Sequence, residues 1–257
     1  MTTLFEQLVL EKTNTQTISL AVEKLAAEYS AGNEGQNGVP DLQYLAERLG
    51  VKSVKIGDIP CDGALIPTSD KTYEVWLKSD VSWRRRRFSL AHELAHAILH
   101  NLLPQTRQIS TRNLFTVPGN QSEERICDAI AAALIMPKQC FLKELFKHDR
   151  ISVGVVEALS KKFGTSLQAT AIRCQEVSII EFALFNVTGF DGDCIKVDRV
   201  VVNSRGQAMV SADDGKFQRN SRFGNRVANS RSDRGLSLIH ISEPTRLRRI
   251  SYAVFCL

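Results

Sequence analysis

The sequence lacks the features of a membrane-spanning or disulfide-built protein. Its longest apolar run, Ala129 to Met136, is too short to cross a bilayer. The six cysteines include no Cys-x-x-Cys pair and are too sparse for a disulfide framework, which favours reduced thiols. The N-terminus has neither a basic start nor a small-residue cleavage site, so we expect no signal peptide. These absences predict a cytoplasmic protein without a membrane partner.

A strong compositional bias is missing as well. Of the 257 residues, 43% are apolar, 24% are charged and 7% are aromatic, which excludes a disordered or fibrous protein. The net charge of +5 favours solubility and is too mild to establish nucleic-acid binding. The length is enough for one large domain or two smaller ones.

Apolar periodicity and turn residues predict an α+β protein. Helical patterns cover four stretches: residues 18–29, 42–49, 82–100 and 121–136. Three strand patterns lie between the second and third of these helices: residues 51–56, 63–67 and 73–78. Three short helical patterns follow between residues 139 and 177, and strand patterns then return at residues 179–187, 194–203 and 207–211.

The clearest chemical signal is the His-Glu-x-x-His motif formed by His92, Glu93 and His96. Residues four apart on a helix are offset by about 40° and 6 Å, so both imidazoles can reach one ion. Zinc accepts neutral nitrogen ligands, and Glu93 could act as the general base towards a water molecule at the open position. The alternative is an amphipathic helix with two exposed histidines. The apolar surroundings of the motif count against that, because two buried histidines without partners are costly.

A third ligand must come from elsewhere in the chain. His100 lies about 12 Å from His92 along an unbroken helix and is expected to be structural. Glu124 is the better candidate, because it opens another helix and Asp128 follows one turn later, able to hydrogen-bond the outer nitrogen of a ligating histidine. This is the gluzincin spacing. Acidic residues in a solvated first turn would explain both carboxylates equally well.

The two motif segments together resemble the ImmA/IrrE family of metallo-endopeptidases. Residues 88–100 read FSLAHELAHAILH and residues 124–137 read ERICDAIAAALIMP, within a resemblance that covers roughly residues 40–180. The resemblance implies a zincin-like metallopeptidase core with His92, His96 and Glu124 as zinc ligands and Glu93 as catalytic base. Asp128 stands where the family often has Asn, and the expected role of Asp128 is to orient a ligating histidine. The resemblance also implies a protein substrate, a helix-turn-helix repressor of the XRE type.

Other features each allow two interpretations. The arginines from Arg84 to Arg87 form either a paired or solvated face or a surface for an acidic partner. The helices between Ser152 and Val177 either resemble a helix-turn-helix unit that touches DNA or the repressor, or support the core. Residues 63–67 and 73–78 could offer a sheet edge to an extended peptide or be covered. Cys127 is expected to be a buried small residue rather than a reactive thiol.

The predicted organisation has four parts. Residues 1–138 form the zincin-like peptidase domain, residues 139–177 a helical segment with helix-turn-helix character, and residues 178–235 a truncated β-rich region. Residues 236–246, LSLIHISEPTR, match a translated transposase-type sequencing adapter, and residues 250–257, ISYAVFCL, match its flow-cell end. We interpret residues 236–257 as an artefact, which resequencing of the locus would test against a chance resemblance.

The functional hypothesis is a cytoplasmic zinc endopeptidase that cleaves an XRE-type repressor and so derepresses a phage, mobile-element or stress-response locus. The alternative is a non-catalytic regulatory or toxin-like partner that binds a repressor or DNA. The presence of Glu93 favours the enzyme, because a purely structural metal site needs ligands but no base.

Overall fold

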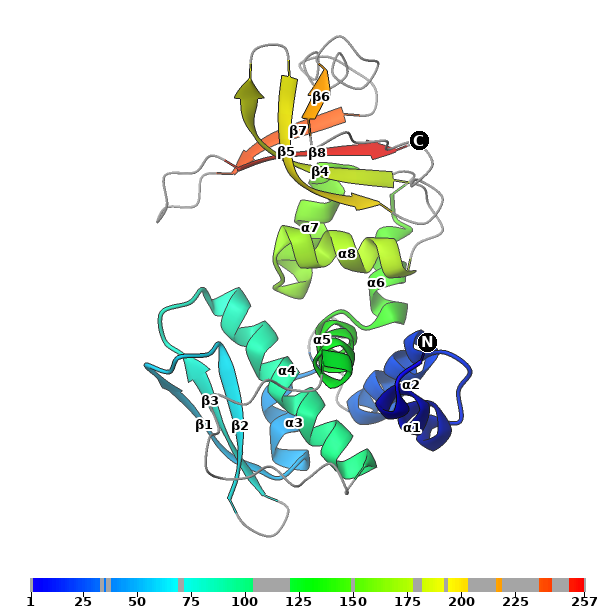
Figure 1. Cartoon of the computed structure of the whole chain (residues 1–257), viewed down its shortest axis with the longest axis vertical. Coiled ribbons are helices and arrows are strands. Elements are labelled where there is room, and N and C mark those ends of the chain that lie inside the picture. The colour runs from blue at the N-terminus through cyan, green and yellow to red at the C-terminus, as the bar shows by residue number, and fades with distance from the viewer. Residues whose placement is uncertain are drawn as a thin grey trace. The chain divides into compact units, whose positions relative to one another are not determined.

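The computed structural model describes most of the chain up to residue 177 and the backbone of five later strands (Figure 1). The described residues are 2–32, 35, 38–68, 72–103, 121–148 and 151–177, and the strands occupy 182–191, 194–202, 216–218, 236–241 and 250–256. The chain divides into two compact units. The first comprises Met1–Cys140 with Phe163–Ser166, and the second comprises Phe141–Lys162 with Leu167–Leu257.

Five of the described helices belong to the first unit: α1 (Leu4–Thr13), α2 (Ile18–Ser30), α3 (Leu42–Arg48), α4 (Trp83–Leu102) and α5 (Gln121–Ile135). Polar side chains fix where they begin. Thr3 and Glu6 form a capping box at α1, and the side chains of Asp41 and Ser82 accept backbone N–H bonds at α3 and α4. Gly50 takes a left-handed φ of 81° just after α3, as a chain reversal into a strand requires.

The sheet of the first unit has three strands, β1 (Val51–Gly57), β2 (Gly63–Pro67) and β3 (Tyr73–Lys78), in the order β1-β3-β2. β1 runs parallel to β3 and β2 runs antiparallel to it, which leaves β2 at one edge of the sheet. Helix α4 packs against β2 and β3 and, on another side, against α5. Figure 1 shows α4 lying along the sheet with α5 beside it.

The core of this unit lies between the sheet, α4 and α5. Leu94, Ile98 and Leu99 of α4 are fully buried, as are Ile130 and Leu134 of α5. Burying these aliphatic side chains contributes about 1.5–3 kcal/mol each. This packing holds α4 and α5 side by side, so that His92 and His96 of α4 meet Asp128 and Glu123 of α5.

The second unit contains most of α6 (Lys138–Leu145), all but the last residue of α7 (Val153–Phe163) and all of α8 (Leu167–Val177). Its five antiparallel strands are ordered β6-β5-β4-β8-β7. Their bounds are β4 (Phe182–Asp191), β5 (Cys194–Val202), β6 (Lys216–Gln218), β7 (Leu236–Ile241) and β8 (Ile250–Cys256). No described helix has the length and apolarity that a bilayer crossing requires.

The predicted α+β class is confirmed, and the strands of the first unit begin and end within one residue of their predicted limits. Helix α1 was not predicted from the sequence, and the strand predicted at residues 207–211 lies outside the described residues. The four domain limits stay predictions. So does the artefact interpretation of residues 236–257, because pairing of β8 with β4 says nothing about the origin of its codons.

Candidate metal centre

Three side chains from α4 and α5 converge on one point. The Nε2 atoms of His92 and His96 are 3.2 Å apart. Glu124, in the first turn of α5, places its two carboxylate oxygens 3.2 Å from Nε2 of His92 and 3.6 Å from Nε2 of His96. Among the described residues, these three form the group of His, Cys, Asp and Glu side chains able to hold a metal ion. The structure thus brings together the predicted ligand set.

The spacing of these atoms fits a zinc ion. Bonds of about 2.0–2.1 Å in tetrahedral geometry place neighbouring ligand atoms about 3.3 Å apart. The two Nε2 atoms are 3.2 Å apart, and each has one of the two Glu124 oxygens within 3.6 Å. Two imidazoles and a carboxylate are also the ligand types of a catalytic zinc site, in which a fourth position stays open to water. The donor set therefore fits zinc in both chemistry and spacing.

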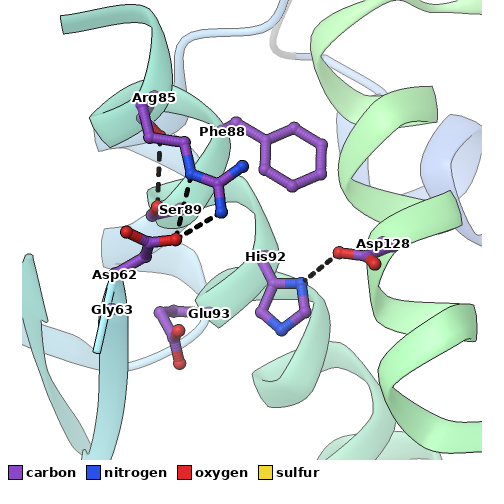
Figure 2. A pocket seen from close by; sticks show the side chains of 8 residues that line it. All are labelled: Asp62, Gly63, Arg85, Phe88, Ser89, His92, Glu93 and Asp128. Carbon is purple, nitrogen blue, oxygen red and sulfur yellow. Dashed lines mark hydrogen bonds and ion pairs between the residues drawn. The ribbon is translucent and has the colours of Figure 1, made fainter. Parts of the chain in front are cut away.

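Each histidine is oriented by a second carboxylate through its outer nitrogen. Asp128 Oδ1 lies 2.9 Å from Nδ1 of His92, as Figure 2 shows, and Glu123 Oε1 lies 3.2 Å from Nδ1 of His96. An Nδ1–H donated to a carboxylate leaves Nε2 as the lone-pair donor that a metal needs. The two contacts thereby favour the ligating tautomer of both rings.

The carboxylates also set the charge of the metal-free site. Burial lowers the pKa of His92, but hydrogen bonds with Asp128 and Glu124 outweigh it and raise this pKa to about 10. The same contact with His92 lowers the pKa of Glu124 below its ordinary value. The metal-free protein at neutral pH therefore holds a proton on His92 that a metal ion must displace.

Glu93 is the buried acid of the site and is only 7% exposed. Burial raises its pKa, while the neighbouring histidines and a hydrogen bond from the backbone N–H of Leu65 in β2 act in the opposite direction. A carboxylate with a raised pKa is a stronger base once it is ionised. Glu93 lies on α4 next to the proposed ligands but outside the converging group, as a base towards a metal-bound water requires.

A cavity of about 210 Å³ opens beside Glu93 and His92 (Figure 2). Gly63, the first residue of β2, and Asp62 just before it line one side, and Arg85, Phe88 and Ser89 of α4 line another. Arg85 donates from Nε to Asp62 at 3.0 Å and makes a second contact through its terminal nitrogen. The cavity therefore joins Glu93 and His92 to a mixed apolar and charged wall.

The run of arginines before the motif makes contacts within the chain. Arg85 pairs with Asp62, and Arg86 and Arg87 donate to the backbone oxygens of Ser79 and Phe163. Arg84 lies 5.3 Å from the centre of the Trp83 ring. The paired face is thus the interpretation that the geometry supports.

Two other residues fall outside the site. His100 is buried and stacks on Tyr73, with ring centres 6.0 Å apart, and it does not belong to the metal-binding group. Cys127 is fully buried, and burial raises the pKa of its thiol well above the usual range, which disfavours the reactive thiolate.

The contact of Glu123 with His96 and those of Gly63 and Leu65 with Glu93 were not predicted from the sequence. Glu123 could have been proposed from its place beside Glu124 in a first turn that faces the histidines. The contacts of Gly63 and Leu65 with Glu93 depend on how β2 packs against α4, for which the sequence carries no local signal.

Comparisons with known proteins agree with this geometry. The sequence profile of the Peptidase_M78 family, described as the IrrE N-terminal-like domain, matches residues 46–175, about half of the chain. A solved structure of a Mycobacterium tuberculosis transcriptional regulator is similar in fold, with a TM-score of 0.50 and 14% identity, over 97% of this chain and 80% of that one. No curated protein matches the sequence.

Proposed function

Because the chain belongs to the Peptidase_M78 family of IrrE N-terminal-like domains, we propose that it is a zinc-dependent endopeptidase. Its substrate is a helix-turn-helix repressor of the XRE type, and cleavage derepresses a phage, mobile-element or stress-response locus. The observation that carries the proposal is the buried Glu93 carboxylate beside the convergent group of His92, His96 and Glu124.

The chain's own residues supply the proton transfers. A bound zinc ion contributes Lewis acidity, which makes a water molecule acidic near neutral pH and polarises the peptide carbonyl. Ionised Glu93 accepts the proton of the attacking water and delivers it to the departing amine nitrogen. Asp128 and Glu123 keep the two imidazoles oriented during this cycle, at 2.9 and 3.2 Å from their outer nitrogens.

Strand β2 offers an extended peptide a place to bind. It is an edge strand of the sheet, and both Gly63 and the backbone N–H of Leu65 approach Glu93. A substrate segment added along this edge would make main-chain hydrogen bonds and pass close to the catalytic carboxylate. The nearby cavity, with Phe88 and Arg85 in its walls, would take a side chain of that segment.

A repressor substrate is supported by family membership, since the matched domain is IrrE-like. The similar Mycobacterium tuberculosis structure carries the name of a transcriptional regulator, which agrees with a role in transcription. Direct reading of DNA by α8 is less favoured. The helix has a single basic residue, Arg173, which is 2% exposed and lies 3.4 Å from Glu176.

The experiment incubates the zinc-loaded full chain with the XRE-type repressor encoded beside its gene and follows the products by intact mass spectrometry. We expect one cut that disappears in Glu93→Gln and with a chelator, while Glu93→Gln still binds about one zinc ion. Glu11→Gln, an exposed change on α1, is the matched control and should cleave normally. A stable complex without any cut would favour the non-catalytic binding partner instead.

A further inference from the structure

Gly63 lies against the carboxylate of Glu93. A Cβ atom added to Gly63 would lie 2.7 Å from Oε1 of Glu93, 3.2 Å from its Cγ and 3.3 Å from its Cδ. We infer that Gly63 is a positioning residue, whose missing side chain creates the space in which the carboxylate of Glu93 is held. The inference rests on the proposed function only in assigning Glu93 the role of base.

Backbone conformation does not explain the glycine. The left-handed glycines among the described residues are Gly32, Gly38, Gly50 and Gly164, and Gly63 is not one of them. It lies in a regular strand and pairs with Leu77 of β3, where alanine would be accepted sterically by the backbone. Glycine weakens a strand and often marks a point of close approach. The close approach here is that of Glu93.

The register of β2 explains why its backbone faces Glu93. The N–H of Lys78 donates to the oxygen of Asp62, and the N–H of Thr68 donates to the oxygen of Thr72. Bonded pairs alternate in an antiparallel ladder, so the backbone groups of Gly63 and Leu65 point away from β3, towards the side of β2 that pairs with no described strand. The Leu65 N–H makes a hydrogen bond to Glu93 from this edge.

Glu93 is thus held from two directions by one strand. Gly63 leaves room for its carboxylate, and Leu65 supplies a donor to that carboxylate. A methyl group at position 63 would force the oxygen to move, since real Cβ atoms essentially never lie within 3.0 Å of a heavy atom in a residue that is not their neighbour in the chain. The oxygen lies at the end of a flexible side chain that lines the cavity, so the carboxylate would shift away from Gly63 and the base would be displaced from the attacking water.

The test is a double-mutant cycle that combines Gly63→Ala with Glu93→Ala in the full chain, read out as the thermal midpoint Tm. Glu93→Ala removes the three heavy atoms that lie nearest to the new methyl group. We expect Gly63→Ala alone to lower Tm by a few degrees, and to leave Tm unchanged or raise it in the Glu93→Ala background. Gly154→Ala, whose Cβ would meet only Ser152 Oγ at 3.8 Å, should behave alike in both backgrounds.

Two further readouts separate positioning from general damage. Zinc affinity of Gly63→Ala, measured by competition with a chelator, should stay within about two-fold of the parent, because the three atoms nearest the methyl group all belong to Glu93, which is not in the metal-binding group. Cleavage of the repressor should lose about ten-fold or more in kcat with little change in KM.

The inference is overturned if Gly63→Ala lowers Tm equally in both backgrounds, or if it leaves kcat unchanged in a protein that cleaves. If the parent protein cleaves nothing, the proposed function fails separately. The double-mutant cycle in Tm still tests the inference in that case. A Tm effect of Gly63→Ala that depends on Glu93 supports the placement of Glu93 by Gly63, and an effect that is independent of Glu93 refutes it.

Discussion

Replacing Asp128 by alanine should weaken zinc binding about ten-fold. Within the described part of the chain, the change removes one hydrogen bond, that of 2.9 Å between Asp128 Oδ1 and the outer nitrogen of His92. Hydrogen bonds to charged groups contribute about 1.5–3 kcal/mol. The Asp128 side chain is 61% exposed, so water can replace part of this contribution and we expect the lower end of that range. A loss of about 1.4 kcal/mol corresponds to a factor of ten in affinity.

The assay is competition for zinc with a chelator of known affinity at fixed pH. Asp58→Ala removes the same charge from an exposed position outside the converging group and serves as the matched control. Glu123→Ala should cost at least as much as Asp128→Ala, because Glu123 is only 19% exposed. Unchanged affinity in Asp128→Ala, or an equal loss in Asp58→Ala, would refute the orienting role of the carboxylate.

Three further outcomes follow from the same contacts. The pKa of His92 is raised to about 10 in the metal-free protein against an ordinary 6.5, so its stabilising contribution is full below about pH 6.5 and is lost as pH rises towards 10. Metal-free Tm should therefore fall over that range while zinc affinity rises, and a flat Tm would contradict this. Burial raises the pKa of Cys127, so its thiol should react with a thiol reagent only after unfolding. Rapid labelling of the folded protein that is lost in Cys127→Ala would contradict this. Gly164→Ala should cost about 1–3 kcal/mol in urea unfolding, more than Gly32→Ala, because both have left-handed φ but only Gly164 would place a Cβ 3.0 Å from Trp83; equal losses would argue against that contact.

The sequence predicted the elements whose patterning is strong. The strands at residues 51–57, 63–67 and 73–78 are short and bounded by turn residues, and α4 carries a periodic apolar face. Helix α1 escaped prediction because only Phe5, Val9 and Thr13 are buried, while exposed Leu4 and partly exposed Leu8 spread apolar residues around the helix and hide its period.

The candidate ligands could be proposed from spacing because each pair lies within one helix. His92 and His96 share a face of α4, and Glu124 and Asp128 share a face of α5. Gly63 could not be proposed in this way. Its contact with Glu93 arises from the packing of a sheet edge on a helix, and nothing in the local sequence states which residue of β2 will face the carboxylate.

The most direct test of the account is cleavage of the XRE-type repressor by the zinc-loaded protein in water enriched in heavy oxygen, followed by intact mass spectrometry. We expect two fragments whose summed mass exceeds that of the repressor by one water molecule. The heavy oxygen should lie in the new C-terminal carboxylate, and Glu93→Gln should give no fragments. Cleavage that persists in zinc-loaded Glu93→Gln, or a repressor left intact by the parent protein despite bound zinc, would contradict it.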